Sequence, residues 1–237
     1  MLMFRPVMRP TRILALTGIS VSLLGTAVAD IETSIGAGYT SEYVFRGTNN
    51  GDDLFDLSLD VSGDGSLGGL GDLSWSAGLW LASFDGAANT NELNIYGEVS
   101  KCLSDTMSVA VGVTNYSYFG GGAIADDIEP YVSLGTELAG LSLGAAAHFD
   151  SSDTLDHDVY YELSVSKDVE LDGVGTLSLS AVLGHFDDGA IDTFYGLSAG
   201  LEIAVSDSIT VTPHISHIID GADDDETFGG VSVGFDF

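Results

Sequence analysis

The chain has 237 residues, with 36 acidic side chains against six Lys or Arg, which gives a formal charge of −30. This balance excludes the basic surface that nucleic-acid recognition requires. The single cysteine, Cys102, excludes an intramolecular disulfide. Hydrophobic residues make up 45% of the chain, yet no stretch after residue 30 approaches the 18 consecutive apolar residues of a membrane-spanning helix.

The first segment differs in character from the rest. It begins with three arginines, continues with an apolar stretch over residues 13–24 that is too short to span a bilayer, and ends in the small residues Ala27-Val28-Ala29. This order is typical of a signal peptide over residues 1–29, with Asp30 as the first mature residue. A retained membrane anchor is the alternative. A lipoprotein is not expected, because Asp30 stands where the lipidated cysteine would be.

Removal of that segment leaves Arg46, Lys101 and Lys167 against 36 acidic residues, a formal charge of −33. Such a surface can attract cations, or it can simply keep the protein hydrated in salty surroundings. Both interpretations remain open at this point.

Along the mature chain, apolar residues alternate with small polar ones, as in Phe55, Leu57 and Leu59 around Asp56 and Ser58. Period two predicts β-strands, and segments of nine to thirteen residues have the length of tilted strands that cross a bilayer. We expect about twelve strands, with ten to fourteen compatible. In chain order the segments are 31–46, 54–62, 72–84, 92–101, 107–118, 128–138, 141–149, 158–168, 176–186, 192–204, 209–217 and 227–237.

The predicted connections alternate in length. Most of one set is short, and the other set is longer and acidic. Short turns at one rim and long loops at the other are typical of an outer-membrane barrel, with the turns in the periplasm. The short set comprises 63–71 (a longer, glycine-rich member), 102–106, 139–140, 169–175 and 205–208, and the acidic set comprises 47–53, 85–91, 119–127, 150–157, 187–191 and 218–226.

The sequence therefore predicts an all-β protein in which residues 30–237 form one closed antiparallel transmembrane β-barrel. Closure is required because hydrocarbon offers no hydrogen-bond partner to an open sheet edge. The alternatives are a soluble β-sandwich or a secreted β-solenoid, which would bury the same alternating stripe. The expected location is the outer membrane of a Gram-negative-type bacterium.

Strand parity assigns each residue to the lipid or to the lumen. Tyr39, Tyr43 and Phe45 are expected to face outward in an aromatic girdle near the loop rim, although aromatics are also ordinary strand residues. Arg46, four residues after Glu42 on the same face, is expected to pair with inward carboxylates and narrow the passage. The predicted lumen-lining residues are Glu42, Arg46, Asp56, Asp60, Glu92, Glu98, Glu137, Glu162 and Glu202.

The segment from Gly38 to Gly47, GYTSEYVFRG, resembles the N-terminal signature of the TorF-type porins, a family of bacterial outer-membrane proteins. The resemblance covers about ten residues and implies a porin-like outer-membrane protein without supplying a substrate. The matching positions are Tyr39, Ser41, Tyr43, Phe45, Arg46 and Gly47.

One pattern resembles a catalytic constellation. His214 and Ser216 share a strand face, and Glu226 follows, so a lipid hydrolase is a minor hypothesis. Parity points both side chains inward, away from a lipid substrate. We expect no catalytic residues, no metal site and no cofactor.

The leading hypothesis is a porin-like channel for passive diffusion of small solutes, either cation-preferring or weakly selective, because carboxylates line the lumen. The alternative is a non-conducting barrel with a structural or surface-binding role, plugged by inward aromatics such as Trp80, Tyr96 and Tyr160. The expected partners are outer-membrane lipids, small solutes and the barrel-assembly machinery, which would recognise the C-terminal Phe237. No nucleic acid is expected.

Overall fold

The computed structural model describes residues 31–66, 71–86, 90–120, 125–151, 159–187, 193–222 and 225–237. Within these ranges the chain forms twelve β-strands. They are β1 (Glu32–Phe45), β2 (Thr48–Ser66), β3 (Asp72–Asp85), β4 (Asn91–Cys102), β5 (Met107–Phe119), β6 (Ala125–Leu138), β7 (Leu141–Phe149), β8 (Val159–Leu171), β9 (Gly175–Phe186), β10 (Thr193–Ser206), β11 (Ile209–Ile219) and β12 (Glu226–Asp236).

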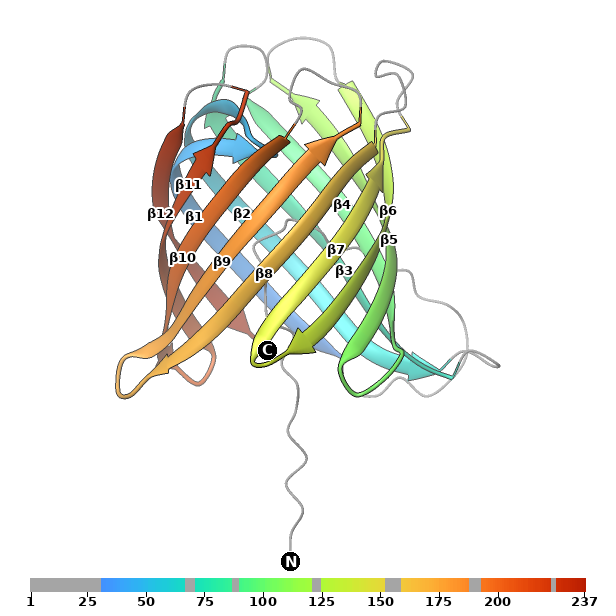
Figure 1. Ribbon diagram of the computed structural model, residues 1–237. Helices are drawn as coiled ribbons and strands as arrows, with labels where there is room; N and C mark the ends of the chain where they lie inside the picture. The colour runs from blue at the N-terminus through green and yellow to red at the C-terminus, as the bar shows by residue number, and fades with distance from the viewer. Residues whose placement is uncertain are drawn as a thin grey trace, which may run out of the picture.

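The strands form a closed antiparallel barrel (Figure 1). Each strand pairs with its neighbours in sequence, and β1 closes the ring on β12, with Ile35 opposite Phe235 and Tyr39 opposite Val231. Closure leaves no open edge, so all strands have hydrogen-bonded neighbours on both sides. The predicted fold class and strand number are confirmed. The even strand number places the start of β1 and the end of β12 at the same rim, the one with the short turns (Figure 1).

The outer surface is apolar. On β8, for example, Tyr161 and Leu163 point outward and are well exposed, at 57% for Leu163, whereas Tyr160 on the opposite face is buried. The same alternation on the other strands leaves a belt of exposed leucine, isoleucine, valine and aromatic side chains around the barrel. A belt of this size is far larger than the apolar patches of soluble proteins and suits hydrocarbon. No helix in the described ranges has the length and hydropathy to span a bilayer.

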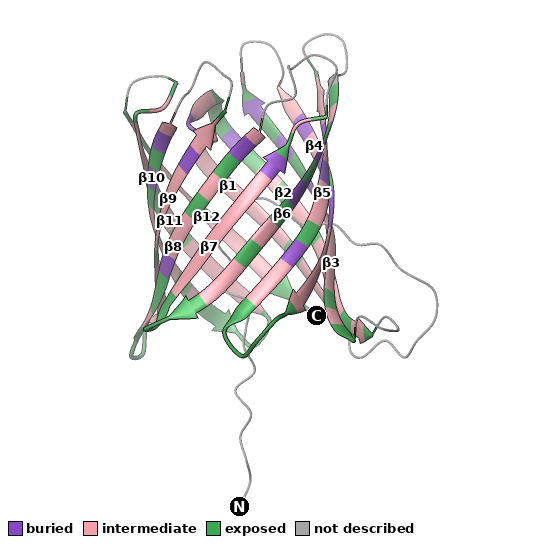
Figure 2. Cartoon of the chain, turned by 45° about the vertical axis from the view of Figure 1, so that its right-hand side comes forward, coloured by how far each residue is buried: buried purple, intermediate pink, exposed green. Residues whose placement is uncertain are grey.

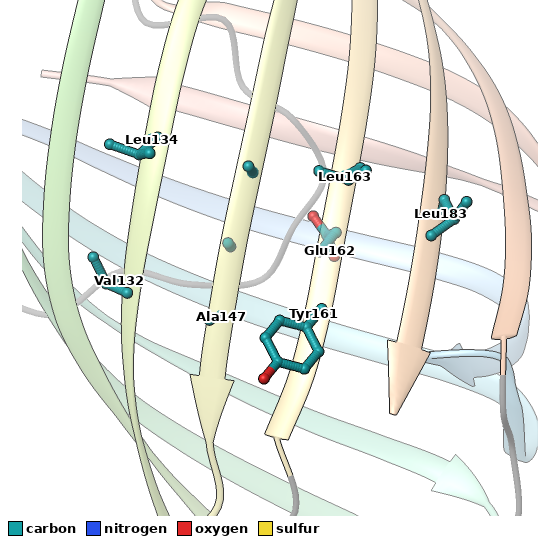
Figure 3. A pocket seen from close by; sticks show the side chains of 9 residues that line it. Val132, Leu134, Ala147, Tyr161, Glu162, Leu163 and Leu183 are labelled. Carbon is teal, nitrogen blue, oxygen red and sulfur yellow. The ribbon is translucent and has the colours of Figure 1, made fainter. Parts of the chain in front are cut away.

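A shallow hollow in this belt lies over β7. Ala147 lies there between larger side chains, with Val132 on β6 and Leu163 on β8 (Figure 3). Ala145 on the same strand also lines the hollow. The hollow arises because β7 has alanine where β6 and β8 have branched or aromatic residues. Its lining is mostly apolar, like the rest of the belt, although Glu162 on β8 also borders it.

The largest difference from the predicted strands concerns β2. The sequence pattern predicts a loop over the acidic segment 47–53, but the strand begins at Thr48 and runs to Ser66. Charged residues have low strand propensity, yet pairing with β1 determines the structure here, with Glu42 opposite Asp52. Likewise, Asp126 and Asp127 belong to β6 and not to a loop. The predicted signal peptide lies outside the described residues, as do parts of the acidic loops.

The lipid-facing position of Leu163 can be tested by substitution. Leu163→Arg in the middle of the belt is expected to cost about 2–4 kcal/mol of unfolding free energy, because the charge enters hydrocarbon. Leu171→Arg, on the same strand and face but at the turn-side end, should cost only about 0–1 kcal/mol. Urea unfolding in lipid vesicles measures both. Equal costs at the two positions would contradict a membrane-embedded belt.

Candidate functional site

The tip of the β1–β2 hairpin leaves the barrel wall. The pairing of β1 with β12 ends at Thr40, where Gly230 is its partner. One residue further, the Oγ atom of Ser41 accepts a hydrogen bond from the backbone N–H of Gly229 at 3.2 Å. On the other side, the register of β2 with β3 is interrupted between Asp52 and Phe55. Asp52 still pairs with Asp85, and beyond Ser41 and Asp52 the two strands β1 and β2 pair only with each other.

The tip bends across the lumen. Arg46 and Gly47 form the turn with positive φ angles of 48° and 78°. Figure 1 shows the blue end of the hairpin curving over at the loop rim. Its side chains reach β6 and β8, which lie across the ring from β1. The hairpin therefore acts as a bar across the loop end of the lumen.

Aromatic packing holds the first part of this bar. Tyr43 is 4% exposed, with its ring centroid 4.9 Å from that of Phe84 and 5.8 Å from that of Trp80, both on β3. The Phe45 ring lies 5.9 Å from Tyr116 on β5. Most of the buried segments gather at the loop end of the barrel (Figure 2). Aromatic pairs at such distances contribute beyond simple burial, so the tip is anchored on the wall.

Arg46 provides the main polar contact of the tip. Its two terminal nitrogens donate to the two carboxylate oxygens of Glu129, at 2.5 and 2.7 Å. The side chains are only 13% and 6% exposed. A two-pronged pair of this kind combines charge with a fixed planar geometry. The contact joins β6 to a residue 83 positions earlier in the chain.

Aromatic and histidine groups surround this ion pair. The guanidinium carbon lies 4.1 Å from the Tyr160 ring centroid and 4.8 Å from that of Phe45. His148 Nδ1 lies 2.9 Å from Glu129 Oε1. Because a carboxylate only accepts, this nitrogen carries the proton. Glu129 thus receives hydrogen bonds from two sides, and Arg46 lies between two rings.

Gly47 completes the turn against β10. A Cβ atom at this position would lie 2.8 Å from Cγ of Phe194. The carbonyl of Gly47 accepts a hydrogen bond from the backbone N–H of Ala222 at 2.8 Å. The positive φ and the close ring both favour glycine, which explains the end of the Gly38–Gly47 motif.

The other inward carboxylates of the upper and middle lumen each accept a hydrogen bond from an aromatic side chain. These bonds hold the carboxylates in place; Glu92 is fully buried, whereas Asp56, Asp60, Glu98 and Glu162 stay partly accessible. The pairs are Tyr43 with Glu92 at 2.7 Å, Trp80 with Asp56 at 3.2 Å, Tyr96 with Asp60 at 2.9 Å, Tyr131 with Glu98 at 2.8 Å, and Tyr160 with Glu162 at 2.9 Å.

The remaining predicted lining residues lie elsewhere. Glu137 and Glu202 are exposed near the turn-side ends of β6 and β10. Glu42 lies in the hairpin opposite Asp52, near Glu226. The structure therefore does not bring these three together with the group around Glu129.

Two predicted orientations are wrong. The alternation assigns Tyr43 and Phe45 to the outer girdle, but Tyr43 is buried inside the barrel and Phe45 packs beside it. Arg46 does not share a regular strand face with Glu42, because the register shifts between Tyr43 and Val44 and Arg46 lies in the turn. Tyr39 does face outward, with its ring 5.0 Å from that of Phe55 and its hydroxyl donating to Asp53.

Sequence reasoning missed Glu129 as a lining residue and left His148 without a partner. Glu129 precedes Pro130 at the start of a strand whose first residues were assigned to a loop. Period two from the strand centre at Tyr131 places Glu129 inward, so the signal was present. The contact between Glu129 and Arg46 depends on the bend of the hairpin. The alternation of apolar and polar residues does not predict this bend.

The hydrolase constellation is not assembled. His214 Nε2 lies 3.3 Å from Thr40 Oγ1, and Ser216 Oγ lies 2.9 Å from Ser198 Oγ. Glu226 accepts a hydrogen bond from Asn49 in the hairpin. Each of the three side chains is thus engaged with a different partner. In the described part of the chain, no cluster of three potential metal ligands occurs.

Small residues line other parts of the lumen wall. Gly36 faces Ser58, and Gly144 faces Ser164 across neighbouring strands.

Within the described ranges, no donor reaches the buried Oδ1 atom of Asn94 on β4. Buried polar atoms of this kind are usually satisfied by water, so this part of the lumen suits water.

The chain matches no protein-family model and no curated protein sequence. Among solved structures it is similar to the NanC porin, with a TM-score of 0.53 and 13% identity over 86% of this chain and 98% of that one. It is also similar to the KdgM porin, with a TM-score of 0.54 and 10% identity over 86% and 99%. A KdgM complex with disordered oligogalacturonate gives 0.50 and 10% over 87% and 99%. At these identities the likeness shows the barrel fold.

The ion pair predicts a measurable coupling. Arg46→Gly and Glu129→Gln should each cost about 3–5 kcal/mol of unfolding free energy, because each removes one member of a buried ion pair. The double variant should cost less than the sum, with a coupling of about 0.5–3 kcal/mol in a double-mutant cycle. The exposed Glu137→Gln on the same strand is the control and should stay within about 0.5 kcal/mol of the original protein. Additive single effects would contradict the pairing.

Gly47 allows a matched comparison of two glycines. Gly47→Ala and Gly140→Ala both place alanine at a φ near +75°, which costs about 1–2 kcal/mol. Nothing lies within 4 Å of a Cβ at Gly140, whereas Phe194 would clash at Gly47. Gly47→Ala should therefore be the more destabilising by about 1–3 kcal/mol in urea unfolding. Equal losses would show that the tip does not pack on Phe194.

Proposed function

We propose that this protein is a porin-like channel of the bacterial outer membrane that passes small solutes by diffusion and prefers cations. The observation that carries the proposal is the charge of the lumen. Asp56, Asp60, Glu98 and Glu162 line it, and within the described ranges Arg46 is the one Lys or Arg residue that reaches into it. Lys101 and Lys167 lie opposite Val109 and Leu179 on the outward face.

An acidic lining of this kind selects by electrostatics. A wall of low dielectric constant concentrates the field of its carboxylates in the water between them, which raises the local concentration of cations and lowers that of anions. Arg46 opposes this field little, because Glu129 neutralises it at 2.5 and 2.7 Å. The hairpin that crosses the loop end limits the size of the solutes that can pass. It leaves the electrostatic potential of the lumen negative.

The second candidate is a non-conducting barrel. The observation that favours it is the extent of the hairpin contacts, which reach from Trp80 on β3 through Glu129 to Phe194 on β10. A bar fixed at so many points can close the passage to solutes. A structural or surface-binding role would then fit the barrel better than transport.

We also propose that Phe237 serves assembly of the barrel in the membrane. The residue is 77% exposed, while its backbone N–H donates to the carbonyl of Thr33 at 2.9 Å. The ring is therefore presented at the turn-side rim by a fixed backbone, as recognition by the barrel-assembly machinery would require.

Planar-bilayer recording tests the channel. In a KCl gradient the zero-current potential should have the sign of cation preference. Glu98→Gln should weaken that preference, because it removes a lumen charge. Asp172→Asn removes an equal charge from the exposed β8–β9 turn and should change the preference much less. Anion preference, or equal effects of the two variants, would refute the selectivity, and absence of conductance would favour the closed barrel.

A further inference from the structure

The group that holds Arg46 is built from the barrel wall and not from the hairpin. Glu129 on β6 supplies the two-pronged acceptor, and Tyr160 on β8 supplies a ring 4.1 Å from the guanidinium carbon. Tyr116 on β5 closes one side, with its hydroxyl 3.4 Å from Glu129 Oε1. A fork-shaped carboxylate beside an aromatic face is the arrangement that recognises a guanidinium group.

Contacts within the wall hold these groups in place without Arg46. His148 Nδ1 lies 2.9 Å from Glu129 Oε1, and its ring stacks on Tyr131 at 5.1 Å. The Tyr160 ring stacks on Phe194 at 6.3 Å, and its hydroxyl donates to Glu162 at 2.9 Å. The wall groups therefore have partners that persist when the hairpin is absent, so the site is preorganised.

Strand pairing connects only part of the hairpin that brings Arg46 to the site with its neighbours β12 and β3. Pairing with β12 ends at Thr40, and the register with β3 is interrupted after Asp52. Arg46 is thus a tethered group at the end of a two-stranded segment, and a tethered group competes with a free solute at a finite effective concentration.

We propose that Glu129, Tyr160 and Tyr116 form a binding site for solutes that carry a guanidinium or a similar planar cation, and that Arg46 occupies this site as a tethered ligand. The inference rests on the proposed channel, because a solute reaches the site through the lumen. It names the class of cation that the lumen recognises. When such a solute takes the site, the bar loses its ion pair and the passage widens.

Removal of the tethered ligand tests the site. Arg46→Gly deletes the side chain and suits the turn, because φ at this position is 48°. This variant should conduct more than the original protein. Methylguanidinium should then reduce its conductance, with a half-maximal effect at about 1–10 mM, the range that two charge-assisted hydrogen bonds and one ring contact provide. N-methylurea, which has a similar shape and no charge, should have no effect at these concentrations.

The second variant isolates the carboxylate. In Arg46→Gly/Glu129→Gln, the methylguanidinium concentration for half-maximal block should rise at least about tenfold, since the negative charge of the Glu129 carboxylate is lost. Methylammonium, which cannot make the two-pronged contact, should block Arg46→Gly only at higher concentrations. Equal block of both variants, or equal block by methylguanidinium and methylammonium, would overturn the proposal.

A measurement without conductance separates this inference from the proposed channel. Millimolar methylguanidinium should raise the unfolding temperature of Arg46→Gly in detergent, and should not raise that of Arg46→Gly/Glu129→Gln. Arg46→Asn, which also tolerates the left-handed turn, provides a second background if the glycine variant folds poorly. Stabilisation without conductance would keep the site and refute the channel, whereas conductance without block or stabilisation would refute the site.

Discussion

Each of the twelve strands has a hydrogen-bonded neighbouring strand on both sides, and the rest of the structure depends on this closure. In hydrocarbon an unpaired N–H or C=O costs several kcal/mol, so the ring closes between β1 and β12. Closure then separates two environments. Side chains of one parity form the apolar belt, and those of the other face a space in which carboxylates keep water or hydrogen-bonding partners.

The hairpin tip is the exception that the closed ring permits. Where β1 passes Ser41 and β2 has not yet reached Asp52, neither strand pairs with its outer neighbour, and this part of the hairpin bends inward. Burial of Tyr43 and Phe45 and the pairing of Arg46 with Glu129 stabilise the tip where the strand pairing with β12 and β3 has ended. The buried ion pair of the lumen thus comes from the hairpin tip, the part of the sheet that has lost its pairing with the neighbouring strands.

Aromatic donors organise the lumen. Tyr43, Tyr96, Tyr131 and Tyr160 each donate to a carboxylate and also pack against the wall. This arrangement lets a narrow barrel hold many acidic groups, because a hydrogen bond from a phenol stabilises a carboxylate without adding positive charge. The lumen therefore keeps its negative sign while its side chains remain fixed, which is the physical basis of the cation preference proposed for it.

Much of the architecture could be predicted from the sequence. Alternation of apolar and polar residues has a period of two only in strands, so the number of strands, their order and the lipid face of residues such as Leu57 and Leu163 followed from pattern alone. The inward orientation of Asp56, Asp60, Glu92, Glu98 and Glu162 followed for the same reason. The alternation of inward and outward side chains is preserved wherever the strand is regular.

The tertiary structure alone decided what happens at the loop rim. Parity fails beyond Thr40, where β1 leaves β12 and the hairpin bends inward, so Tyr43 and Phe45 point into the barrel although the pattern assigned them outward. The partner of Arg46 is 83 residues away, on the opposite wall, and is chosen by the diameter of the ring and the bend of the hairpin. Sequence by itself determined the barrel, since each strand carries its own alternation. Only the closed ring could bring Arg46, Glu129 and Tyr160 together, because their contact depends on distances across the lumen that no local pattern encodes.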